Sequence, residues 1–131
     1  MKPRIVGPAD ARRYMVGGHA CDVVSMPDEN GIGGFALETS PVGFASPFHV
    51  HHRDDGVFYI LEGAIRIKCG DLDAVAVQGS TIFLPRGIPH AFRVEGEVPL
   101  RWFNLQAPHG DFMCRTMGEE ADIEVLGPSP F

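Results

Sequence analysis

The sequence of 131 residues contains few cysteines, little positive charge and no long apolar run. Its three cysteines are odd in number, widely spaced and form no CxxC pair, so we expect free thiols rather than a disulfide framework. Eleven Lys and Arg residues stand against 17 Asp and Glu residues, and nucleic acid is therefore not an expected partner, because phosphate binding needs a basic face. No run approaches the ~18–20 apolar residues that span a bilayer. The N-terminal residues also lack the apolar segment of a signal peptide, so we expect no membrane association and a cytoplasmic location.

Glycine and proline are abundant, with 16 and 11 residues respectively. This surplus argues against a helical bundle and favours short strands joined by tight turns. The pattern predicts one all-β domain over residues 1–131, a jelly-roll barrel whose core covers about residues 30–110, with an N-terminal arm and a C-terminal tail. Residues 9–16 are expected to form a short helical turn, and residues 118–126 a loose strand or helical turn. Strands are expected at 35–40, 48–52, 57–61, 64–69, 72–77, 81–84, 90–94 and 99–106.

Three of the six histidines fall within four residues. On a strand, side chains two residues apart share a face, so His49 and His51 are expected to point together and His52 away from them. His90 stands on a distant predicted strand. Two imidazoles on one strand and a third on another are typical of a metal site on a β scaffold. His19 is expected to be peripheral, and His109 is expected in a loop.

Two stretches carry a family resemblance. Residues 47–63, PFHVHHRDDGVFYILEG, and residues 79–90, GSTIFLPRGIPH, resemble in order the two motifs of the cupin superfamily. The chain is most similar to quercetin-dioxygenase-like monocupins. The resemblance implies a single-domain cupin with a double-stranded β-helix (jelly-roll) barrel. It also implies one divalent metal ion, Fe, Zn, Ni or Mn, held by His49, His51 and His90.

The sequence departs from the first motif at Gly56, where the family has a glutamate ligand. Three alternatives follow. Water molecules complete a three-histidine site, Asp55 reaches the metal through a bulge, or another side chain replaces the carboxylate. The candidates for the last role are His52, His109, Asn104 and Gln106.

The resemblance implies a metal-dependent enzyme that acts on a small aromatic or enolisable substrate, with a dioxygenase as the first expectation. A redox-neutral polyketide cyclase or isomerase is the alternative, because loss of the glutamate removes a candidate base while a three-histidine site still supports Lewis-acid chemistry. A non-catalytic small-molecule-binding cupin is a third interpretation.

Other side chains are assigned by the strand pattern. Five are expected to line a pocket for an aromatic substrate or to fill the barrel core, namely Phe58, Ile60, Phe83, Phe92 and Trp102. Asp54 and Asp55 are expected to form a solvated turn. Val57 and Tyr59 face outward in this pattern, which predicts a homodimer.

Overall fold

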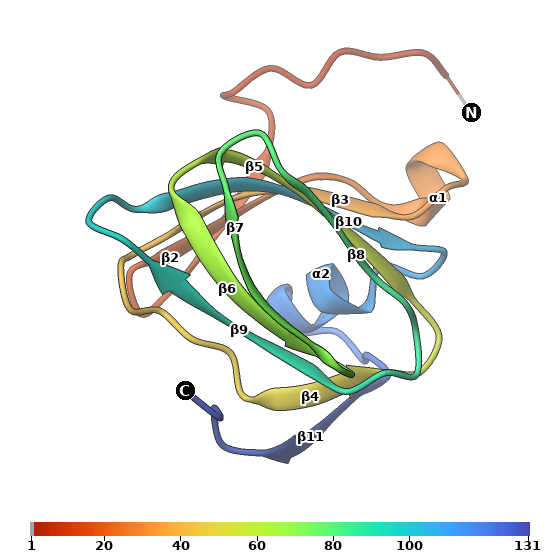
Figure 1. The fold of residues 1–131 in the computed structure, drawn as a ribbon. Coiled ribbons are helices and arrows are strands. Elements are labelled where there is room, and N and C mark those ends of the chain that lie inside the picture. Colours follow the sequence, from red (N-terminus) through yellow and green to blue (C-terminus); the bar gives the residue numbers. More distant parts are fainter. Residues whose placement is uncertain (1) are drawn as a thin grey trace.

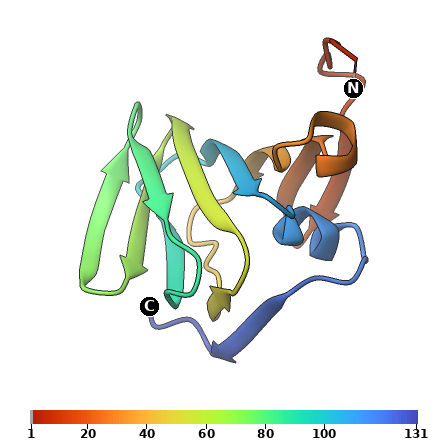
Figure 2. The same ribbon diagram turned by 90° about the vertical axis from the view of Figure 1, so that its right-hand side faces the viewer.

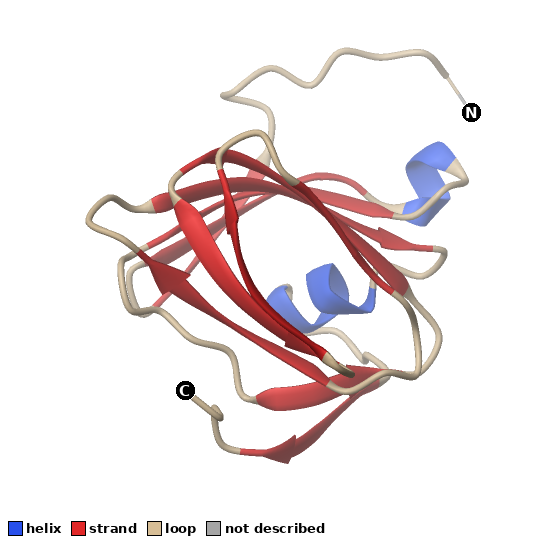
Figure 3. Cartoon of the chain, in the orientation of Figure 1, coloured by secondary structure: helices blue, strands red, loops and turns tan. Residues whose placement is uncertain are grey.

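The computed structural model describes residues 2–131 as two antiparallel sheets with two short helices (Figures 1 and 3). The strands of the six-stranded sheet, in spatial order, are β1 (Arg12–Val16), β2 (His19–Ser25), β3 (Gly34–Ser40), β10 (Leu100–Ala107), β5 (Asp55–Glu62) and β8 (Thr81–Leu84). Those of the five-stranded sheet are β11 (Ile123–Gly127), β4 (Phe48–His51), β9 (His90–Glu95), β6 (Ala64–Cys69) and β7 (Leu72–Val77). The helices are α1 (Pro27–Asn30) and α2 (Asp111–Thr116). Neither helix is long and apolar enough to cross a membrane.

The two sheets face each other and enclose a barrel, which Figure 1 views nearly along its axis and Figure 2 from the side. Strands distant in sequence alternate within each sheet, since β10 lies between β3 and β5 and β9 lies between β4 and β6. All the strand pairs are antiparallel. The predicted all-β, single-domain jelly roll is confirmed.

The chain ends contain β1, β2 and α2, which the sequence patterns did not predict, whereas the strand expected as one alternative within residues 118–126 is confirmed by β11. The predicted helical turn at residues 9–16 is wrong, because Arg12–Val16 form β1 and pair with β2 along their whole length. Gly17 and Gly18 make the connecting turn with φ values of 54° and 83°, which glycine adopts without strain. Tertiary pairing thus overrides a weak local helix signal. The tail forms α2 and then β11, which pairs with β4.

Alternating side chains build the apolar core at one end of the barrel. Ile65 and Ile67 from β6 and Trp102 from β10 are at most 2% exposed, and each meets side chains of the opposite sheet. Burying one such side chain contributes about 1.5–3 kcal/mol to the free energy of unfolding. The cluster comprises Phe58, Ile60, Ile65, Ile67, Cys69, Ile82, Leu84, Phe92, Val94, Leu100 and Trp102. The other end of the barrel holds the polar side chains described below.

Asp54, at the end of the histidine-rich segment, fastens α2 to the barrel. Its carboxylate is 1% exposed and accepts hydrogen bonds from the backbone N–H groups of His109 at 2.6 Å and Asp111 at 2.8 Å. Arg53 donates two hydrogen bonds to the buried carboxylate of Asp111, both at 2.8 Å. The expectation of a solvated turn is therefore wrong for Asp54, because a fixed pair of backbone donors replaces its water.

We expect Asp54→Ala to lower the free energy of unfolding by about 2–4 kcal/mol, because two backbone N–H groups lose their acceptor. Chemical denaturation followed by tryptophan fluorescence measures the change. Asp71→Ala is the matched control, since Asp71 is exposed and makes no side-chain hydrogen bond in the described chain. A change of less than about 0.5 kcal/mol in both variants would contradict the anchoring role.

Candidate metal centre

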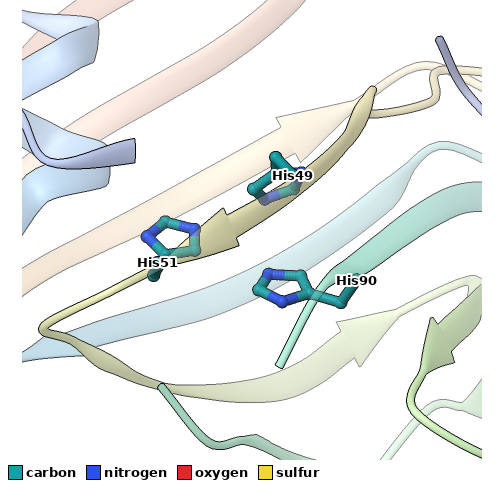
Figure 4. A group of neighbouring side chains, drawn as sticks. All are labelled: His49, His51 and His90. Carbon is teal, nitrogen blue, oxygen red and sulfur yellow. The ribbon is translucent and has the colours of Figure 1, made fainter. Parts of the chain in front are cut away.

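Three imidazoles converge at the polar end of the barrel (Figure 4). His49 and His51 project from β4, and His90 projects from β9 directly opposite His49, its cross-strand partner. The ring centroid of His90 lies 4.5 Å from that of His49 and 5.3 Å from that of His51. One nitrogen from each of the three rings lies within 4.8 Å of the other two. The two-residue spacing on β4 and the β4–β9 register therefore create the cluster.

Backbone carbonyls orient two of the rings. His49 Nδ1 hydrogen-bonds the carbonyl of Pro47 at 2.8 Å, and His90 Nδ1 hydrogen-bonds that of Ile88 at 3.0 Å. A carbonyl only accepts, so Nδ1 carries the proton in both rings and Nε2 keeps its lone pair. His51 has no partner at Nδ1 although this atom is buried. His49 and His90 therefore each keep a lone pair at Nε2 that is available to a metal ion.

The imidazoles are neutral at neutral pH. Burial, with the neighbouring histidines adding to it, lowers the pKa of His51 to about 3 and that of His90 to about 4. Burial also lowers the pKa of His49, and the positive charge of Arg115 lowers it further. Neutral imidazole is the form that binds a metal ion. The donor set therefore fits a divalent transition metal without prior loss of protons.

The cluster lines a cavity of about 420 Å³. Its walls are mostly apolar or aromatic, and Arg115 is the only lining side chain that carries a permanent charge in the described chain. No carboxylate lines this part of the structure. Arg115 itself makes no side-chain hydrogen bond or ion pair among residues 2–131, so its guanidinium is free to meet an anion. The lining comprises Val16, His19, Phe44, Ala45, Ser46, Pro47, His49, His51, Phe58, His90, Phe92, Trp102, Asn104, Gln106, Phe112, Arg115, Thr116 and Ile123.

A larger hollow of about 560 Å³ lies elsewhere, between β6 and the C-terminal residues. Lys68 and Cys69 line it, together with Pro128 and Pro130. No histidine lines this hollow. The smaller cavity is therefore the one that contains the candidate metal-binding side chains.

Of the five side chains considered as replacements for the missing glutamate, three point elsewhere. Asp55 forms an ion pair with Arg86 at 3.0 Å, and His52 is half exposed with its Nε2 3.0 Å from Glu124. His109 is exposed and hydrogen-bonds the backbone of Arg53. The remaining two, Asn104 and Gln106, are buried and line the cavity.

The aromatic pocket is only partly as expected. Phe58, Phe92 and Trp102 belong to the core cluster and also line the cavity, whereas Ile60 lies in the core alone. Phe83 is 60% exposed, so its assignment to the pocket is wrong. Along β8 the buried positions are Ile82 and Leu84, which forces the residue between them to the outer face.

A buried polar chain next to the cavity includes His19, which the sequence placed at the periphery. His19 is 4% exposed, stacks on Phe44, and binds Ser40 Oγ through Nδ1 at 2.7 Å and Glu38 Oε1 through Nε2 at 2.8 Å. Burial raises the pKa of Glu38, against the opposing effect of its hydrogen bonds. Both ring nitrogens of His19 are occupied, so the ring supports the wall rather than reaching a substrate proton. Nothing in the residues next to His19 predicts its burial, because its hydrogen-bond partners Glu38 and Ser40 lie on β3, a different strand.

Two facing antiparallel sheets with three inward histidines at one end define a jelly-roll barrel with a candidate mononuclear metal centre. Residues 36–105 match the cupin domain family, and the chain belongs to this family. The uncharacterized protein MJ1618 of Methanocaldococcus jannaschii is 33% identical over 61 residues, 47% of this chain, and the match spans 49% of that protein.

Solved structures show the same fold. A predicted oxalate decarboxylase, TM1287 of Thermotoga maritima, superposes with a TM-score of 0.70 at 17% identity, over 79% of this chain and 97% of that one. The Fe(II) form of HppE superposes with a TM-score of 0.63 at 15% identity, over 79% of this chain and 60% of that one. At these sequence identities the similarity shows a shared fold and nothing about function.

We expect the wild-type protein to bind about one equivalent of a divalent transition metal, and His51→Ala to lose most of that binding. Removing one of three neutral donors leaves too few to displace the ion's water. Elemental analysis after dialysis against Co²⁺ measures the stoichiometry.

His52→Ala is the matched control for this measurement, because His52 directly follows β4, is exposed and lies outside the cavity lining. It should retain the wild-type stoichiometry. Equal metal content in all three proteins would show that the cluster is not the binding site.

Proposed function

We propose that the protein is a metal-dependent enzyme that binds a small, mostly apolar molecule as its enolate or phenolate anion and, with iron, cleaves it as a dioxygenase. One observation carries the proposal. The cavity combines three neutral imidazoles with the exposed, unpaired guanidinium of Arg115, and its lining contains apolar side chains and neutral polar ones but no carboxylate. Nothing in the lining neutralises a bound cation, so the site favours an anionic ligand.

Each part of the cavity has a task in this proposal. His49, His51 and His90 would hold the metal ion, which when bound would polarise a substrate oxygen and, as iron, would activate O₂ taken from solution. Arg115 pairs with a second oxygen or a carboxylate of the substrate. Phe58, Phe92 and Trp102 pack against the apolar body and exclude water. The side chains thereby fix which bond of the substrate faces the metal.

The same cavity also supports two alternative functions. A redox-neutral cyclase or isomerase is favoured by the lack of a carboxylate base, since Lewis-acid polarisation is then the main chemistry available. A non-catalytic cupin would use the cavity to bind the same class of molecule. The similarly folded HppE was solved in its Fe(II) form, which supports iron as the metal of the proposed enzyme.

The proposal also includes a homodimer. Tyr59, Leu61 and Phe83 are 42%, 40% and 60% exposed on the outer faces of β5 and β8. Exposed apolar side chains grouped on a sheet face are typical of a contact between subunits. This face lies on the outside of the barrel and leaves the cavity accessible.

Oxygen consumption tests the reaction class. Iron-loaded protein incubated with flavonols and acyclic β-diketones is expected to consume one O₂ per molecule of substrate lost, and His51→Ala is expected to consume none. Substrate conversion without oxygen uptake would assign the cyclase or isomerase instead. Saturable binding without conversion would assign the non-catalytic cupin.

For a substrate that is turned over, we expect Arg115→Met to raise KM about tenfold, as the loss of one charged hydrogen bond predicts. Arg101→Met is the matched control, because Arg101 is exposed and lies outside the cavity lining. It should leave KM unchanged. An unchanged KM in Arg115→Met would show that Arg115 does not contact the substrate.

A further inference from the structure

Gly56 and Gln106 occupy adjacent inward positions at the cavity wall. They are cross-strand partners in the β5–β10 ladder, and both are buried. A Cβ atom built on Gly56 would lie 3.0 Å from Nε2 of Gln106. The amide of Gln106 therefore fills the space that a side chain at position 56 would enter.

Hydrogen bonds fix which end of that amide remains free. Glu38 Oε2 accepts a hydrogen bond from Asn104 Nδ2 at 2.8 Å, which commits the Asn104 amide nitrogen to the carboxyl group. Asn104 Oδ1 then accepts from Gln106 Nε2 at 2.9 Å. The chain of bonds leaves Gln106 Oε1 as the unpaired acceptor, because one donor of each amide is already committed.

This oxygen is one of two buried side-chain polar atoms without a hydrogen-bond partner among the described residues, the other being Nδ1 of His51. Both residues line the same cavity, and Gln106 is 3% exposed. A buried acceptor left without a partner costs about 1–3 kcal/mol, so such an atom calls for an explanation. Amide carbonyl oxygens are ligands of divalent cations, and a cation in this cavity would satisfy the free oxygen.

We propose that Gln106 Oε1 is the fourth protein ligand of the metal ion, in place of the carboxylate missing at Gly56. Asn104 and Glu38 are positioning residues that hold the amide with its oxygen toward the cavity. The substitution of a neutral amide for a carboxylate leaves the charge of a divalent ion uncompensated by its ligands. The inference rests on the metal site of the proposed function and deepens it, because an uncompensated charge is what attracts an anionic substrate.

Co²⁺ binding to the full-length protein tests the proposal without any substrate. We expect Gln106→Leu to weaken Co²⁺ affinity at least tenfold by titration calorimetry and to change the visible ligand-field spectrum of bound Co²⁺. Gln106→Glu should tighten binding, because it supplies an anionic oxygen at the same place. The second variant keeps the test decisive if Gln106→Leu fails to fold.

Gln78→Leu is the matched control, since Gln78 is the other glutamine of the chain and is exposed. It should reproduce the wild-type affinity and spectrum. An unchanged affinity in Gln106→Leu and Gln106→Glu would overturn the proposal. So would weaker binding of Gln106→Leu with an unchanged spectrum, which would assign Gln106 to orienting His51 instead. A wild-type protein that binds Co²⁺ through Gln106 yet turns over nothing would refute the enzymatic function alone.

Discussion

The site depends on one backbone constraint, the pairing of β4 with β9 in the register that sets His49 opposite His90. The paired histidines are 41 positions apart in the sequence, so only the closed barrel brings them together. A shift of one residue on β4 would turn His49 and His51 outward and bring Val50 and His52 inward. The histidine cluster of the candidate metal centre is therefore a direct consequence of strand register rather than of loop conformation.

The segments next to these paired histidines also provide hydrogen bonds that orient the rings and hold α2 in place. The rings of His49 and His90 each hydrogen-bond the carbonyl two residues earlier, so the segment that leads into each strand orients its ring. Asp54, three residues after His51, fastens α2 across the barrel, and α2 contributes Phe112 and Arg115 to the cavity wall. The histidine segment thus supplies the metal donors and also positions the element that completes the cavity.

The sequence predicts the features that depend on local patterns, such as the two-residue alternation of side chains along a strand. Strand alternation placed His49, His51 and His52 on their observed faces, and the two cupin motifs predicted the barrel. Pairing between distant segments decides the rest. His19 is buried because Glu38 and Ser40 lie on the neighbouring strand, and Asp54 is buried because α2 presents backbone donors to it. Neither partner is visible within a window around the residue itself. Phe83 faces outward because it lies between the buried residues Ile82 and Leu84 of β8, in agreement with strand alternation.

The charge balance of the cavity links these features to chemistry. The three imidazoles have lowered pKa values and are therefore neutral donors. The nearby carboxyl groups already have partners within the protein. Asp54 accepts from backbone amides, Asp55 pairs with Arg86, and Glu38 binds His19 and Asn104. A dication in an apolar wall with no anionic ligand is electrostatically incomplete. In the proposed function the missing negative charge comes from the ligand, so we expect a ligand with an acidic oxygen to bind more tightly than its neutral form. The proposed preference for anionic ligands therefore rests as much on the absence of a carboxylate at Gly56 as on the three histidines.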